Sequence, residues 1–110
     1  MNEWINVNND IVEIFYERKI PLSLLPVSLL IAGHMNDDTN EIYLLKSRKK
    51  QFAKILGIGT DRMNALVPIC KQYGIISPMQ DRGRYMVNPY LFYKGEEEKQ
   101  KEIRIEFDTL

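Results

Sequence analysis

The spacing of apolar residues is most regular between positions 60 and 74, where it predicts a helix. Met63, Val67 and Cys70 recur at intervals of four and three residues, so they share one helical face, and Gly74 ends the pattern. Pro68 lies inside this helix and removes one backbone hydrogen bond. A bent or shortened helix with an intact first turn is therefore expected.

A second helix is predicted just before the first, over residues 48–56. Ser47 is placed to cap it, and Phe52, Ile55 and Leu56 should face the core while the lysines between them stay in solvent.

The junction between these helices has the features of a helix-turn-helix, and a hairpin follows it. Ala53 is small where two helices approach, Gly57 lies where the first helix must stop, and Ile58 would fill the turn. Residues 75–80 and 84–89 are extended runs joined by the turn DRG. This order predicts an α+β fold, a winged helix-turn-helix with about three core helices, a short strand and a C-terminal β-hairpin wing.

The N-terminal pattern is less regular. Residues 1–20 fit a strand near residues 4–8 or a helix near residues 9–18, because no single period accounts for their apolar positions.

A strongly apolar helix is predicted next. Pro21 and Pro26 bracket its start, Ser23 is a candidate cap, and the helix should end near Asn36. After a turn-forming loop, the run EIYLL at 41–45 predicts a short strand.

The C-terminal residues divide into an aromatic segment and a charged tail. The aromatic segment, Tyr90 to Tyr93, should fold back onto the core or supply an interface for a homodimer. In the tail, Ile103, Ile105 and Phe107 alternate with charged residues, which is typical of an edge strand that could pair with a partner. We therefore expect a winged-helix DNA-binding domain over residues 1–95 and a charged tail over residues 96–110.

Charge is unevenly distributed although the 110 residues sum to zero. Residues 46–84 carry nine positive and two negative side chains, a net charge of +7. The first 45 residues carry two positive and seven negative side chains, and residues 95–110 carry three and six. A basic middle between acidic ends is typical of a protein that binds phosphate groups, although solvated helix faces would give the same composition.

Candidate chemistry for an enzyme or a metal site is sparse. His34 is the only histidine and lies in the apolar helix, where a role in packing is the better interpretation. Cys70 falls on a predicted buried face, and Asp37 and Asp38 lie in a turn without the alternation of a calcium loop. We expect no catalytic residue, no cofactor and no metal site.

The longest apolar run, at residues 24–33, is too short to span a bilayer, and the acidic start of the chain does not resemble a signal peptide. A cytoplasmic protein without a membrane partner is expected.

A family resemblance follows from two segments, EIYLLKSRKKQFAKILGIG and RGRYMVNPYLFYKG. Together they resemble plasmid replication proteins of the RepL type, over about residues 4–95 and most closely at residues 84–95. The resemblance implies a winged helix and a role in plasmid replication. This chain departs from the family pattern at Gly59, where a serine is usual, and at Pro68.

Taken together, these features favour a sequence-specific protein for double-stranded DNA that initiates or controls plasmid or phage replication. A transcriptional regulator of the same fold, or a winged-helix protein-interaction module without DNA binding, remains as an alternative. Arg62 and Asn64 are predicted to read base edges. The remaining expected DNA contacts lie on both helices and on the wing: Ser47, Arg48, Lys49, Lys50, Thr60, Asp61, Lys71, Arg82 and Arg84.

Overall fold

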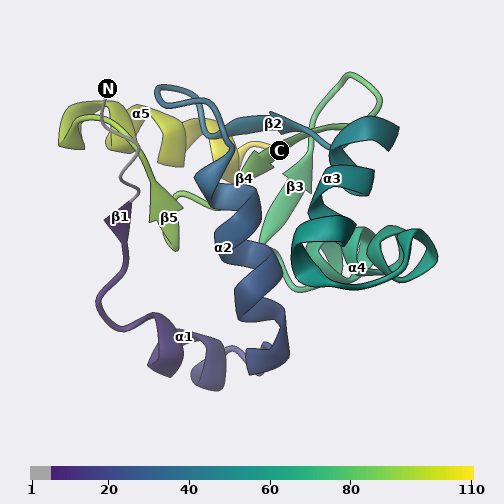
Figure 1. The fold of residues 1–110 in the computed structure, drawn as a ribbon. Helices are drawn as coiled ribbons and strands as arrows, with labels where there is room; N and C mark the ends of the chain where they lie inside the picture. Colours follow the sequence, from purple (N-terminus) through teal and green to yellow (C-terminus); the bar gives the residue numbers. More distant parts are fainter. Residues whose placement is uncertain (1–5) are drawn as a thin grey trace.

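The computed structural model describes residues 6–110, which form an α+β winged helix (Figure 1). Helices α3 and α4 lie on one side of the molecule, and strands β1 and β5 lie on the other. The elements, in chain order, are β1 (Asn6–Val7), α1 (Ile11–Glu17), a short 3-10 helix η1 (Leu22–Leu24), α2 (Leu25–Gly33), β2 (Glu41–Tyr43), α3 (Lys46–Leu56), α4 (Thr60–Gln72), β3 (Ile76–Pro78), β4 (Arg84–Val87), β5 (Phe92–Tyr93) and α5 (Glu97–Asp108).

Three strands form the wing sheet in the order β2-β4-β3, all antiparallel. Ile42 pairs with Tyr85, and Ile76 pairs with Val87. Ile42, Ile76 and Val87 belong to the main hydrophobic core, and Tyr85 packs against it. Met86 points to the opposite face of β4 and is also fully buried, so both faces of this strand are covered.

Both expectations for the N-terminal residues are met in part, because a strand and a helix occur one after the other. Strand β1 pairs with β5 through Asn6 opposite Tyr93, and α1 buries Phe15 in the core. Residues 4 and 5 of the expected strand lie outside the described residues.

The apolar helix α2 is shorter than the sequence predicts. It starts at Leu25, after the 3-10 helix, and no side chain caps it, so Ser23 is not its cap. It ends at Gly33 rather than near Asn36. The ammonium group of Lys94 donates hydrogen bonds to the carbonyl oxygens of Gly33 (2.9 Å) and Met35 (3.1 Å), which satisfies this early end.

The expected edge strand at residues 96–110 is wrong, because these residues form helix α5. Gln100 and Ile103 are its buried residues, and Phe107 is half-buried. Ile103 and Phe107 are four residues apart, a spacing that suits one helical face as well as one strand face. Ile105, which completes the alternation, is 69% exposed. Glutamates at the start of α5 also favour the helix, since they complement its dipole.

Candidate nucleic-acid interface

The turn between α3 and α4 has the predicted geometry. Gly57 adopts φ +69°, a left-handed conformation that favours glycine, and it closes α3. The amide of Ile58 donates to the Ala53 carbonyl oxygen at 3.0 Å, and Ile58 packs against the core. Ala53 is buried, and α3 and α4 pack against each other. These three residues fix the angle at which α4 leaves α3.

Helix α4 keeps its buried face and its length. Met63, Val67 and Cys70 are buried as predicted, and burial raises the pKa of the Cys70 thiol to about 11, so the thiol stays protonated at neutral pH. The helix continues through Pro68 for 13 residues, so the expected shortening does not occur. Pro68 faces solvent, where the missing N–H leaves the acceptor that it would have used open to water.

The exposed side of α4 contains every predicted contact on this helix: Thr60, Asp61, Arg62, Asn64 and Lys71. Successive residues are rotated by about 100° along a helix, so Arg62 and Asn64 lie on opposite flanks of the exposed side. Arg62 lines a cavity of about 170 Å³ beside Leu24 and Val27 of the neighbouring helices. Asn64 shares the other flank with Lys71, seven residues later. Arg62 and Asn64, which are predicted to read base edges, therefore lie at the two edges of the exposed side of α4 and not next to each other.

Helix α3 presents its cationic side chains next to this surface. The helix starts at Lys46 with Leu45 as its N-cap, and no side chain caps it, so Ser47 is an exposed first-turn residue and not the predicted cap. Lys50 is exposed and Lys49 is half-buried. Arg48 lies 5.8 Å from the centre of the Phe52 ring, a cation–π contact that holds its guanidinium close to the helix.

One core prediction for α3 is wrong. Ile55 is 57% exposed, whereas Phe52 and Ala53 are buried and Leu56 packs against the core. The core face of α3 is centred on these three residues, and Ile55 is rotated away from its centre by about 100°.

The two wing arginines have different environments. Arg82 is exposed in the hairpin turn. Arg84 is held by two carboxylates: its Nη2 atom lies 2.6 Å from Glu41 Oε1, and its Nη1 atom lies 3.3 Å from Asp81 Oδ2. The hydrogen bond to Glu41 is the main cause that raises the pKa of Arg84 above its ordinary value. Arg84 therefore ties β4 to β2 at the base of the wing.

Gly83 allows the wing turn to close. It adopts φ +77°, and a Cβ atom there would collide with the side chain of Leu45. This contact sets the wing against the start of α3.

Several polar side chains stabilise the fold through contacts that the sequence does not indicate. Asn40 is fully buried with φ +56°, and its amide donates to the carbonyl oxygens of Val87 (3.0 Å) and Phe92 (2.8 Å). The ammonium group of Lys94 also lies 3.6 Å from Asp37 Oδ1. A tolerance of asparagine for left-handed φ was the only local signal for Asn40.

Asn88 is a structural residue. Its side-chain oxygen accepts a hydrogen bond from the Tyr90 amide at 2.8 Å, and its amide donates to the Gly74 carbonyl oxygen at 2.9 Å. The first bond closes an Asx turn. Asn88 therefore stabilises the turn that follows the wing.

The aromatic segment folds back onto the core. Leu91 and Phe92 are buried within this chain, so the first of the two expectations for this segment is confirmed. Tyr90 and Tyr93 are half-buried. The Tyr90 hydroxyl donates to Asp108 Oδ2 at 2.6 Å, which raises the pKa of Tyr90, and the Arg104 guanidinium lies 5.0 Å from the Tyr90 ring centre.

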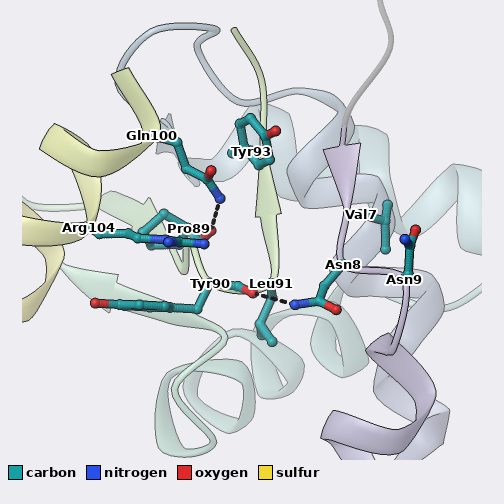
Figure 2. Close-up of a pocket in the computed structure, with 9 residues that line it drawn as sticks. All are labelled: Val7, Asn8, Asn9, Pro89, Tyr90, Leu91, Tyr93, Gln100 and Arg104. Atoms are coloured by element: carbon teal, nitrogen blue, oxygen red, sulfur yellow. Dashed lines mark hydrogen bonds between the residues drawn. The ribbon is translucent and has the colours of Figure 1, made fainter. Parts of the chain in front are cut away.

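Figure 2 shows how α5 attaches to this segment. The Gln100 amide donates to the Pro89 carbonyl oxygen at 3.2 Å, and Arg104 stacks over Tyr90. A cavity of about 280 Å³ remains between these side chains and Asn8 and Asn9, near β1. These contacts make α5 an integral part of the winged-helix body.

The histidine and the acidic residues do not gather into a metal site within residues 6–110. His34 Nδ1 lies 3.0 Å from the Leu30 carbonyl oxygen, and its ring packs edge-on against Phe52 at 5.0 Å. No group of three or more histidine, cysteine or acidic side chains in this range is placed to hold a metal ion. In the same range, no helix has the length and apolar character needed to cross a membrane.

Comparison with known proteins identifies the family. A family model described as Firmicute plasmid replication protein (RepL) matches residues 27–110. The chain belongs to the RepL family. The match starts in α2 and extends to the last residue, so it includes α5, which the sequence resemblance omitted, and excludes residues 4–26, which that resemblance had covered. No curated protein and no solved structure shows significant similarity to the chain.

Membership of the RepL family assigns the chain a role connected with plasmid replication. The structure explains the role of the motif YMVNPYLFYKG. Within this motif, Asn88 closes a turn, Leu91 and Phe92 fill the core, and Lys94 ends α2. The motif that resembles the RepL family most closely therefore stabilises the fold.

Proposed function

We propose that this RepL protein binds double-stranded DNA in a sequence-specific manner and thereby initiates or controls replication of a plasmid or phage. The observation that carries this proposal is the concentration of positive charge on the helix-turn-helix and wing. Residues 46–84 have a net charge of +7, and the cationic side chains of α3 and α4 form no ion pair with residues 6–110. Unpaired surface cations attract the phosphate backbone of DNA.

The first turns of α3 and α4 add to this attraction. Neither helix has a side chain that caps its N-terminus, since the N-cap residues are Leu45 and Gly59. Their first-turn amides are therefore open to phosphate oxygens, which helix N-termini favour. In the proposed complex, α4 enters the major groove, and Ser47, Lys49 and Lys50 bind phosphates along its border.

Specificity is assigned to Arg62 and Asn64. Arginine can bind guanine with two hydrogen bonds and asparagine can bind adenine in the same way. Their positions on opposite flanks of α4 would let them contact base pairs on either side of the helix axis. Thr60, Asp61, Lys71 and Arg48 would contact the groove walls, and Arg82 would extend the interface along the wing. Arg84, which is paired with Glu41, would hold the wing in place.

The double variant Arg62→Ala/Asn64→Ala tests this assignment. We expect the affinity ratio between target and scrambled duplexes to fall at least about tenfold, because each bidentate base contact contributes about 1–3 kcal/mol of discrimination. Fluorescence anisotropy with both duplexes measures the ratio. The matched control is Arg18→Ala/Asn9→Ala, which removes an exposed arginine and an exposed asparagine outside the helix-turn-helix. If discrimination survives in the test variant, Arg62 and Asn64 do not read the target.

A transcriptional regulator would bind DNA through the same interface and would differ only in the step that follows binding. The protein-interaction module has less support than DNA binding. Its two expected surfaces, the aromatic segment and the tail, are occupied by contacts within the chain. Deletion of residues 96–110 would remove the buried Ile103 and expose the residues that it covers. A truncated protein therefore cannot distinguish DNA binding from protein interaction.

In line with its membership of the RepL family, we propose a non-enzymatic protein that acts in the cytoplasm on plasmid DNA. Two copies bound to adjacent half-sites would gain affinity through avidity. Such a dimer would have to use a surface other than Leu91 and Phe92.

A further inference from the structure

The outer edge of the wing sheet carries backbone groups that pair with no neighbouring strand. In the order β2-β4-β3, one edge of β2 is free. The Asn40 carbonyl oxygen and the Leu44 amide bond to β4 and its turn, at 2.8 and 2.7 Å. Because hydrogen-bonding directions alternate along an antiparallel strand, the backbone groups of Glu41 and Tyr43 point to the free edge.

Only the Tyr43 groups remain open on that edge. The Glu41 carbonyl oxygen accepts a hydrogen bond from the Asn36 amide at 2.8 Å, and the Glu41 amide donates to Thr39 Oγ1 at 3.3 Å. Within residues 6–110, no comparable partner faces the Tyr43 amide or carbonyl. One donor and one acceptor are thus presented side by side at the edge.

These groups border a cavity of about 280 Å³ between the end of α2, strand β2 and the start of α3. The Tyr43 side chain is 48% exposed, and its hydroxyl donates to Asp81 at 3.3 Å. His34 and Arg48 also line the cavity, and both are held against Phe52. The cavity therefore combines the Tyr43 side chain, the Arg48 guanidinium and a pair of backbone hydrogen-bonding groups, beside the Glu41 carboxylate that Arg84 holds.

We propose that this cavity binds an unpaired nucleobase of single-stranded DNA. The base would stack on the Tyr43 ring and form hydrogen bonds with the Tyr43 backbone, while Arg48 and Lys46 bind the adjoining phosphates. Stacking on aromatic side chains beside cationic groups is the general way in which proteins hold single strands. This inference rests on the proposed function, and it would give a replication protein a contact for the strand that is exposed when a duplex opens.

A peptide strand fits the same edge less well. The edge offers the backbone groups of Tyr43 alone, since those of Glu41 are used and α3 begins at Lys46. Strand addition needs several successive backbone pairs. A single planar group with a donor and an acceptor matches one residue of free edge.

The test compares three variants in binding to a short labelled oligothymidylate, which cannot form a duplex. We expect Tyr43→Ala to weaken single-strand binding about fivefold or more, and Tyr43→Phe to keep the affinity of the wild type. Both changes remove the hydroxyl bond to Asp81, so their difference reports the ring. Tyr16→Ala, which removes an 81% exposed tyrosine on α1, is the control for the loss of a surface tyrosine.

Duplex binding is measured in parallel, so the two proposals can fail separately. Loss of single-strand affinity in Tyr43→Ala, with duplex affinity kept, supports the cavity. Equal single-strand affinity for Tyr43→Ala and Tyr16→Ala overturns it, because the cations alone would then hold the strand. Absence of single-strand binding by the wild type also overturns it and leaves the edge for a peptide partner, whereas absence of duplex binding overturns the proposed function.

Discussion

The two sides of the molecule use cationic side chains in opposite ways. On the side of α3, α4 and the wing turn, most cations of both helices and of the turn are exposed, and none of them forms an ion pair with residues 6–110. Around β5 and α5, two cations are drawn inward: Lys94 is 5% exposed and binds two carbonyl oxygens, and Arg104 stacks on Tyr90. A lysine or arginine that stabilises the fold (a framework cation) therefore differs in its burial and its contacts, and not in its residue type, from one that is exposed and available for binding.

The largest expected effect is on the buried side. We expect Lys94→Met to lower the free energy of unfolding by about 3 kcal/mol, because the carbonyl oxygens of Gly33 and Met35 would lose a charged donor in a buried position. Urea denaturation measures the change. The control is Lys101→Met on the exposed side of α5, for which we expect a change within about 0.5 kcal/mol. Equal effects of both substitutions would remove the distinction between a buried framework cation and an exposed one.

The wing arginines provide a second comparison, with smaller effects. Arg84→Ala should lower the melting temperature by a few degrees, since Glu41 loses its partner at 2.6 Å. Arg82→Ala should leave the melting temperature unchanged and weaken duplex binding about fivefold through the loss of one phosphate contact. Thermal melts and anisotropy separate the two outcomes. A loss of stability in Arg82→Ala, or a pure loss of affinity in Arg84→Ala, would reverse the assigned roles.

The parts of the fold that could be predicted from sequence are those set by neighbouring residues. Ala53, Gly57 and Ile58 lie within six positions and define the turn by themselves. The wing turn is equally local, because Gly83 supplies the left-handed φ between two extended runs.

The parts that could not be predicted depend on distant partners. Asn40 contacts residues 47 and 52 positions away, and Lys94 contacts residues about 60 positions away. Arg84 was predicted to contact DNA, because nothing in the sequence indicates that Glu41, 43 positions earlier, is its partner. The alternation at Ile103, Ile105 and Phe107 suits a strand, but these residues form a helix whose side chains Gln100 and Asp108 bond to Pro89 and Tyr90, 11 and 18 positions earlier.

The central claim, that the helix-turn-helix and wing bind a specific duplex, is tested most directly by anisotropy with labelled fragments from the protein's own gene and its flanks at two salt concentrations. The account predicts tight binding to one fragment and a steep loss of affinity with salt. In Lys49→Ala/Lys50→Ala, the salt slope should be shallower by about 2, because two phosphate contacts are lost. Equally weak binding to every fragment, or a salt slope that the double variant leaves unchanged, would contradict the account.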